Sequence, residues 1–533
     1  LIMIIFLIWG LLLSAALWLY LRQVYSRFSK YGVRHLKPLP LLGNNAKLLL
    51  RMQHMTENIE KHYKAFPDDR FIGSYEFTNP VMIIRDVDLI KKITVKDFEY
   101  FLNHRAIIHE EADPFFGKSL ISLQDQKWKD MRSTLSPAFT SSKIRLMVPF
   151  MEEVGEQMIK SLKIKIKQSE NGYIDVDSKD MLSRYANDVI ASCAFGLKVD
   201  SHAEDNQFYK MGKLATTFSF LQMLTFFGYM VFPYIMKKLK IGVFNKKSTN
   251  FFNDLVMSTM KDREMRNINR NDMIHLLMEA KKGKLTHEDK ATHDSDAGFA
   301  TVEESDVGKK QVQRVWTDDD LTAQATLFLF AGFETVSSVM VFLLYELAVN
   351  PDIQEKLAKE IKETHEKNNG KIDFNSIQQM VYMDMVVSEV LRLWPPAIGT
   401  DRKCVKDYNC GRANKDATED YIIRKGEAVN IPIWAIHRSA EYFPDPLKLD
   451  PERFSEENKH NIKPFTYMPF GLGPRNCIGS RFALCEVKVM LYQLLLTMVV
   501  SPAAKTCIPA ELAIESFNLR MKGGDWIRLN IRD

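Results

Sequence analysis

Hydrophobic residues run almost without interruption from Leu1 to Leu21 and form the strongest apolar segment of the chain. A helix of that length extends roughly 31 Å, which is enough to cross the hydrocarbon core of a bilayer. Several basic residues and no acidic residue follow over residues 22–37. The positive-inside rule therefore predicts a membrane anchor over residues 1–21, with the bulk of the chain facing the cytosol. A cleaved signal peptide is the competing interpretation, but its apolar core is shorter and its charges lie on the other side.

The pattern after the anchor predicts one large and mainly helical domain. Residues 22–45 are basic and contain Pro38 and Pro40, which indicates a stiff hinge, and residues 46–533 form the domain itself. Short strand-like runs occur at residues 81–84, 428–433 and 526–531. The polar stretch 281–314 predicts a long surface loop. The expected fold class is thus mainly α with a small β region.

One helix is predicted to be unusually long. Thr317 can cap its start, Asp320 completes a capping box, and the intervening acidic residues suit the positive end of the helix dipole. The apolar pattern continues to Val349 and stops before Pro351, which gives a helix of roughly 50 Å. A helix of this length must cross the whole domain.

Charge and cysteine usage narrow the class of protein. The 533 residues carry a formal net charge of only +5, which is too weak to indicate a nucleic-acid partner. The 6 cysteines include no Cys-x-x-Cys pair, so they fit a reducing compartment better than a disulfide scaffold.

The decapeptide at residues 470–479, Phe-Gly-Leu-Gly-Pro-Arg-Asn-Cys-Ile-Gly, carries the main candidate chemistry. A lone thiolate such as that of Cys477 can bind haem iron, and Arg475 can pair with a haem propionate. Taken singly, the residues favour ordinary roles, because most cysteines are small buried hydrophobes and a Gly-x-Gly pair usually marks a turn. A phosphate loop would need a Gly-Lys-Ser/Thr ending, which is absent here. The spacing of the whole segment favours haem ligation.

This segment, with Phe470, Gly473, Arg475, Cys477 and Gly479 at the fixed positions of Phe-x-x-Gly-x-Arg-x-Cys-x-Gly, resembles the haem-binding loop of the cytochrome P450 family. The resemblance implies the fold of that family and haem b as cofactor. It also implies that Cys477 is the axial ligand of the iron, with Phe470 and Arg475 beside the haem. The order of the motifs and the segment at residues 137–140 look most like insect microsomal members of the detoxifying clan.

A second motif, Ala331-Gly332-Phe333-Glu334-Thr335, lies in the middle of the long predicted helix. Alone it is a weak signal, since a mid-helix threonine usually bonds its own backbone. The small residues can open space for a ligand, and the resemblance implies that Thr335 and Glu334 deliver protons to dioxygen. Val336 stands where many members of the family have a hydroxyl, which places the outer part of that relay in question.

Further motifs match the family's propionate contacts and its structural network. Trp128 and Arg132 share one helix face, and with Arg402 they correspond to the residues that bind the haem propionates. Glu389 and Arg392 fit Glu-x-x-Arg. The resemblance implies that, with Arg453, they hold the loop at residues 470–479 that carries Cys477, called the cysteine loop below. As an isolated surface pair, Glu389 and Arg392 would contribute little.

The chain has no flavin or dinucleotide loop of its own, so the resemblance implies that electrons come from partners. These are NADPH–cytochrome P450 reductase and, as a second donor, cytochrome b5, at the membrane of the endoplasmic reticulum. A positive surface that could steer an acidic flavin domain is predicted at Lys127, Lys129, Arg481 and Lys488.

The implied reaction is the insertion of one oxygen atom from O₂ into a lipophilic small molecule, either a xenobiotic or an endogenous lipid or hormone. Several phenylalanines are expected to form the pocket roof and a second membrane contact: Phe208, Phe218, Phe220, Phe226, Phe227 and Phe232. Two other functions stay open at this point. One is an isomerase or dehydratase on the same fold, and the other is a haem-thiolate ligand binder without turnover.

Overall fold

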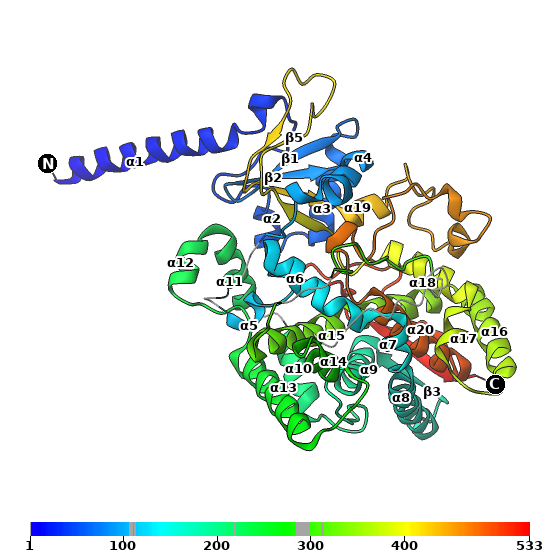
Figure 1. Cartoon of the computed structure of the whole chain (residues 1–533). Coiled ribbons are helices and arrows are strands. Elements are labelled where there is room, and N and C mark those ends of the chain that lie inside the picture. The colour runs from blue at the N-terminus through cyan, green and yellow to red at the C-terminus, as the bar shows by residue number, and fades with distance from the viewer. Residues whose placement is uncertain are drawn as a thin grey trace. The chain divides into compact units, whose positions relative to one another are not determined.

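Helices make up most of the described chain, and its strands belong to small sheets (Figure 1). The computed structural model describes residues 2–105, 110, 113–217, 220–283, 298–310 and 314–532. It divides into two units. The first unit comprises Leu1–Arg105 and Ala397–Ser439, and the second comprises Ala106–Pro396 and Ala440–Asp533. Of the predicted loop at residues 281–314, the structure describes residues 281–283, 298–310 and 314.

The first unit begins with α1 (Ile2–Tyr25), which has no buried residue and is apolar and long enough to cross a membrane. Its main sheet has the strand order β1 (Phe71–Glu76), β2 (Asn79–Ile84), β7 (Ala428–Ile431), β4 (Thr400–Lys403). β2 and β7 are parallel, and the other neighbours are antiparallel. The remaining elements are α2 (Ala46–Leu49), α3 (Met55–Ala65), α4 (Val87–Lys91), β5 (Tyr408–Asn409), β6 (Ile422–Ile423) and α19 (Ile433–His437).

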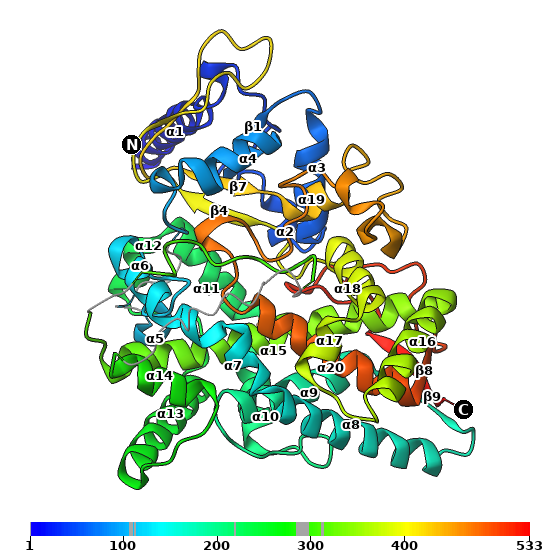
Figure 2. The same cartoon turned by 45° about the vertical axis from the view of Figure 1, so that its right-hand side comes forward.

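The second unit is built around α15 (Asp318–Val349). This helix packs against α9 (Ser178–Cys193), α10 (Gln207–Thr216) and α13 (Lys246–Arg266), which Figure 1 shows around it. Figure 2 shows α16 (Pro351–Lys367), α17 (Phe374–Gln378), α18 (Val381–Leu393) and α20 (Ser480–Thr497) side by side. The other elements are α5 (Pro114–Gly117), α6 (Asp125–Leu135), α7 (Ser141–Arg145), α8 (Val148–Gln168), α11 (Phe220–Val231), α12 (Pro233–Lys238), α14 (Met273–Lys281), β3 (Tyr173–Asp177), β8 (Met498–Ser501) and β9 (Trp526–Ile531), and the strands pair in the order β3-β9-β8.

The sequence-based expectations for these elements are largely confirmed. α15 starts at the predicted cap: the Thr317 side chain accepts from the backbone N–H of Asp320, and the Asp320 side chain accepts from the backbone N–H of Thr317. β9 has the predicted bounds, and β2 contains residues 81–84. The strand predicted at residues 428–433 ends earlier, at Ile431, because Pro432 has no N–H to continue the ladder.

Candidate functional site

The middle of α15 opens to solvent-accessible space at two positions one turn apart. Most of the helix between Asp320 and Ala348 is buried, but Ala331 and Thr335 are exposed. The hydroxyl of Thr335 donates to the backbone carbonyl of Ala331, so the side chain bonds its own helix. This is the usual behaviour of a threonine in the middle of a helix. Both residues lie on one face. The opening is therefore a local feature of this face.

Gly332 serves a different purpose from the one its sequence context suggests. A Cβ atom at this position would lie 2.8 Å from Cδ1 of Ile190 on α9. The glycine thus permits α9 and α15 to pack closely, and it is the exposed neighbour Ala331 that borders the open space. The helix contact therefore accounts for Gly332, and room for a ligand beside Ala331 stays a prediction.

The cysteine loop is closed by backbone hydrogen bonds. The N–H of Cys477 donates to the carbonyl of Phe470 at 2.8 Å, and the N–H of Asn476 donates to the carbonyl of Gly473 at 3.0 Å. Gly471 and Gly473 have φ values of 77° and 67°, a region that residues with a Cβ rarely adopt. The loop then leads directly into α20, whose positive dipole end faces the segment that carries Cys477.

Cys477 is the exposed residue of an otherwise enclosed loop. Arg475, Asn476 and Ser480 around it are buried. Desolvation by the surrounding protein raises the pKa of the Cys477 thiol, while the N–H of Gly479 and the charge of Arg132 lower it. Exposure and desolvation are compatible when the sulfur faces an interior space that is lined by protein. Such a space next to a lone sulfur can accept a flat prosthetic group.

Trp128 and Arg475 meet at this loop. The guanidinium of Arg475 lies 3.8 Å from the centre of the Trp128 ring, and Trp128 is buried on α6. Arg475 also donates to the backbone carbonyl of Leu123 at 2.9 Å. Stacking on an aromatic face and a carbonyl contact fix the orientation of this planar cation. The structure therefore brings together two of the residues that the sequence assigns to haem binding.

Arg132, one turn after Trp128 on α6, holds the backbone of the cysteine loop. It donates to the carbonyl and to the side-chain oxygen of Asn476, each at 2.7 Å. It also forms a bidentate pair with Glu304, with donor–acceptor distances of 2.7 and 3.2 Å. Glu304 was not among the residues predicted to matter, because it lies inside the polar stretch that was predicted to be a surface loop.

The predicted network of Glu389, Arg392 and Arg453 is present. Glu389 and Arg392 on α18 have fully buried side chains and form a bidentate pair at 2.7 and 2.8 Å. Arg453 lies 3.3 Å from the same carboxylate, and the N–H of Asp450 donates to it. The two guanidiniums and the N–H neutralise a charge that would otherwise be costly to bury. The network joins α18 to the segment that precedes the cysteine loop.

Arg402, the remaining predicted propionate contact, belongs to the first unit. It is fully buried on β4 and donates to the hydroxyl of Thr400 and to the carbonyl of Asp401. Burial lowers its pKa to about 10, although the nearby Asp401 acts in the opposite direction. Its role at a haem stays a prediction.

Glu334 is directed toward α9 and the carboxyl-terminal segment. One of its oxygens, Oε1, lies 3.0 Å from Nζ of Lys179 and accepts a hydrogen bond from the side-chain amide of Asn518 at 3.0 Å. Lys179 also donates to the hydroxyls of Ser337 and Ser338. These are the two hydroxyls that follow Val336. They therefore bind the ammonium of Lys179, a residue that motif analysis missed because it lies far away in the sequence.

Comparison with known proteins shows to which family the chain belongs. Residues 33–526 match the sequence model of the family described as Cytochrome P450. The chain is 46% identical over 517 residues to cytochrome P450 9e2 of Blattella germanica, covering 95% of this chain and 94% of the relative. The chain belongs to the cytochrome P450 family. It is also 42% identical to the probable cytochrome P450 9f2 of Drosophila melanogaster (94% of each chain) and 33% identical to cytochrome P450 6j1 of Blattella germanica (96% and 95%).

Membership makes the chain a P450 monooxygenase and implies a haem-iron cofactor, a redox partner and a lipophilic substrate. The donor set of the second unit fits such a cofactor. It offers an accessible thiol at Cys477, an oriented guanidinium at Arg475, and an opening on α15 at Ala331 and Thr335. A bound haem supplies the iron at which dioxygen is cleaved, and a thiolate ligand favours that cleavage.

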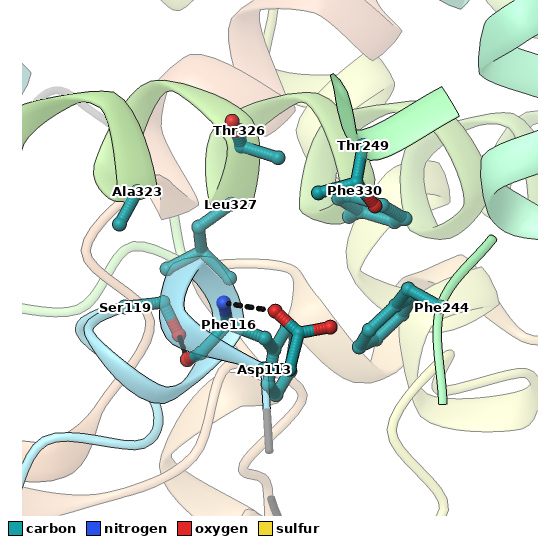
Figure 3. Close-up of a pocket in the computed structure, with 9 residues that line it drawn as sticks. All are labelled: Asp113, Phe116, Ser119, Phe244, Thr249, Ala323, Thr326, Leu327 and Phe330. Atoms are coloured by element: carbon teal, nitrogen blue, oxygen red, sulfur yellow. Dashed lines mark hydrogen bonds between the residues drawn. The ribbon is translucent and has the colours of Figure 1, made fainter. Parts of the chain in front are cut away.

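A small apolar pocket of this P450 lies beside the amino-terminal half of α15 (Figure 3). α15 lines it with Ala323, Thr326, Leu327 and Phe330, and the other lining residues are Asp113, Phe116, Ser119, Phe244 and Thr249. The rings of Phe116 and Phe244 lie 4.6 Å apart, and those of Phe244 and Phe330 lie 4.9 Å apart. Asp113 accepts the N–H of Phe116, as the dashed line shows.

One expectation about the docking surface of this P450 is wrong. Lys488 has a fully buried side chain, and its Nζ lies 2.9 Å from Asp384, so it cannot steer a partner. The helices α8, α15, α16 and α17 pack around α20, and they leave no part of the Lys488 side chain exposed. Lys127, Lys129 and Arg481 each keep part of their surface.

Proposed function

We propose that this chain is a microsomal haem b monooxygenase that oxidises lipophilic small molecules with electrons from NADPH–cytochrome P450 reductase. The observation that carries the proposal is the exposed Cys477 in a loop whose neighbouring residues are buried. An exposed thiol in such surroundings is suited to bind an iron ion. The aromatic side chains of Phe116, Phe244 and Phe330 form an apolar surface along α15, which favours an apolar substrate.

The proposed binding roles follow from the contacts described above. Cys477 would hold the haem iron through its sulfur, and the carbonyl of Phe470 supports it through the backbone hydrogen bond that closes the loop. Arg475 and Trp128 present a cation and an indole N–H to the propionates, with Arg402 as a further contact. Arg132 is proposed as a propionate contact too, and its bonds to Asn476 already make it a support of the loop.

Thr335 and Glu334 are proposed to move protons. The Thr335 hydroxyl is exposed on α15 and can hold a water or donate a proton after it releases the carbonyl of Ala331. Glu334, the next residue along the helix, has a carboxylate that can exchange protons with the surroundings of Lys179 and Asn518. In this proposal each residue passes on a proton and neither forms a covalent bond to substrate.

The proposed electron donors are the reductase and, as a second donor, cytochrome b5. Lys127 and Lys129 on α6 and Arg481 on α20 are the remaining candidates for a positive docking surface. Their helices also carry or adjoin the residues of the cysteine loop. If this surface steers an acidic flavin domain, reduction should slow with added salt.

The chain is proposed to be anchored in the membrane of the endoplasmic reticulum, with its catalytic domain in the cytosol. Residues 1–21 form the anchor, residues 22–45 the hinge and residues 46–533 the monooxygenase domain. The exposed apolar surface of α1 supports the anchor. α1 itself continues beyond Leu21 to Tyr25.

The test of the proposed function is a reduced carbon monoxide difference spectrum of the whole chain, followed by reconstitution with reductase. The wild type should show a thiolate-ligated haem, and Cys477→Ser should lose or transform that band because an alcohol does not supply the thiolate. Cys507→Ser is the matched control, since this cysteine lies outside the loop and is partly exposed. A Cys477→Ser protein with the wild-type band and turnover would refute the proposal.

Reconstitution separates the alternatives. A monooxygenase consumes NADPH and O₂ and forms an oxygenated product from a lipophilic substrate. Turnover that proceeds without NADPH would instead indicate the isomerase or dehydratase, and a substrate-induced spectral change without turnover would indicate a ligand binder. A screen of lipophilic compounds with product identification then distinguishes xenobiotic from endogenous substrates.

A further inference from the structure

Lys179 is a buried ammonium group at the carboxylate of the proposed proton relay. Its side chain is 3% exposed, and it reaches from the first turn of α9 to the middle of α15. Its Nζ lies 3.0 Å from Oε1 of Glu334, and it donates to Ser337 and Ser338 at 2.7 and 3.0 Å. A buried ammonium group needs such partners, and the carboxylate and the two hydroxyls offset the cost of burying its charge.

The contact with Lys179 fixes the direction of the Glu334 side chain. Asn518 donates to the same oxygen, Oε1, that lies next to Lys179, so this oxygen is held from two sides. Thr335 points elsewhere, because its hydroxyl donates to the carbonyl of Ala331. Glu334 and Thr335 are therefore neighbours in sequence whose polar groups make different contacts in this structure. The residues that hold the Glu334 side chain therefore determine whether it can pass a proton to Thr335.

We propose that Lys179 is a positioning residue that holds the Glu334 carboxylate in place for proton delivery through Thr335. The inference rests on the proposed function, since it gives Glu334 and Thr335 the roles assigned there. While Lys179 is charged, its ammonium keeps the Glu334 carboxylate directed toward α9. When Lys179 loses its proton to solvent, Glu334 loses its cation and the orientation that the pair imposes.

The charges around Lys179 place this change in an accessible pH range. Burial lowers the pKa of Lys179 to about 8, Glu334 raises it, Arg520 lowers it, and Asp525 raises it. Arg520 and Asp525 come from the segment before β9 and pair with each other at 3.1 Å. On α9 itself the next residue, Asp180, is paired with Arg184. The ammonium is therefore charged at neutral pH and titrates just above it.

The test is the pH profile of coupling, measured as product formed per NADPH consumed by the full-length enzyme with reductase. In the wild type, this ratio should fall as pH rises through about 8, since Lys179 then loses its charge. Lys179→Arg keeps a permanent charge and should retain coupling with no fall in this range. Lys179→Met should be several-fold less coupled at every pH and should also show no fall near pH 8.

Lys213→Met is the matched control. This lysine is exposed on α10 and lies 3.4 Å from Asp180 of α9, so it belongs to the same region without contact to Glu334. It should retain the wild-type profile. The inference would be overturned if Lys179→Met coupled like the wild type, or if the fall near pH 8 persisted in both Lys179 variants.

A second readout needs no turnover. Trace acetylation of Lys179, followed by mass spectrometry across pH, reports the pKa of its amine. Glu334→Gln should lower that pKa, because a neutral amide no longer favours the ammonium. An unchanged labelling profile would overturn the inference.

The two readouts also separate this inference from the proposed function. Absence of the thiolate band or of turnover in the wild type would count against the haem-thiolate function. A normal band with unchanged coupling in Lys179→Met would count against Lys179 alone.

Discussion

Thr335 has a hydroxyl that is exposed on a helix whose other residues are mostly buried. The exposure follows from its position one turn after Ala331, on the face that opens. Sequence alone predicted the residue and its bond to a carbonyl one turn back, because both depend on spacing within one helix. It could not show that Gly332 serves the contact with Ile190, since that contact depends on how two helices pack.

Replacing Thr335 by alanine should uncouple the enzyme. The variant should still bind haem and consume NADPH, because Cys477 and its loop are untouched. Product per NADPH should fall several-fold and hydrogen peroxide should rise, since the hydroxyl that can donate a proton is missing. The measurement is the ratio of product and peroxide to NADPH consumed with reconstituted reductase.

Thr335→Ser is the control for this prediction, because it keeps the hydroxyl and removes only a methyl group. It should remain closer to the wild type than Thr335→Ala does. Equal coupling in the wild type and Thr335→Ala would remove Thr335 from the proton path.

At the level of elements, local signals were predicted best. The capping box of α15 and the helix that carries Trp128 and Arg132 depend on residues within one or two turns. The short strand β3 was missed, because its partner β9 is distant in sequence and a few residues carry little pattern. β1 was also missed, although its partner β2 follows it directly. Glu304 was missed because only the folded chain brings it to Arg132.

The contact between α18 and the segment around Arg453 should depend on the buried ion pair. Arg392→Ala leaves the Glu389 carboxylate buried with only part of its partners, and both side chains of this pair are 0% exposed. Breaking a buried pair in this way costs about 3–5 kcal/mol. The variant should show a lower thermal unfolding midpoint and a smaller fraction of haem-loaded protein.

Lys359→Ala, which removes an exposed ion pair on α16, is the control for Arg392→Ala. Its contact with Glu363 is also an ion pair within one helix, but both side chains are largely exposed and the distance is 3.9 Å. Removing it should cost less than about 1 kcal/mol. Similar midpoints for the two variants would show that burial of the Glu389 pair has no special importance.

On the scale of the whole molecule, the sequence predicted one large domain after the anchor, and this stays a prediction. The structure divides into two compact units, and the segment Ala397–Ser439 returns to the first of them. The return of Ala397–Ser439 to the first unit could not be predicted, because it depends on the pairing of β7 with β2 and of β4 with β7. Parallel pairing of β2 with β7 joins residues more than 300 positions apart, as in Val81 opposite Ala428. No local pattern encodes such a partner.

Membrane contact is the remaining prediction at this scale, and it concerns two surfaces. α1 exposes apolar side chains along its whole length. In the second unit, α11 and α12 with the residue that follows α12 also expose large apolar side chains, including Leu221, Tyr234, Ile235 and Leu239. Exposed apolar groups in this number indicate an interaction surface, and a lipid bilayer fits a chain with an apolar anchor.

Removal of residues 1–25 should therefore weaken binding to phospholipid vesicles without abolishing it. Further replacement of Leu221, Ile235 and Leu239 by serine should release the truncated protein, because each fully inserted side chain contributes about 1.5–3 kcal/mol. Co-sedimentation with vesicles measures both steps. The control replaces Met265 and Leu447, which are equally exposed but lie outside α11 and α12, and it should leave binding of the truncated protein unchanged. If the truncated protein already fails to bind, or if the serine replacements have no more effect than the control, the second membrane contact does not exist and α1 alone holds the enzyme at the bilayer.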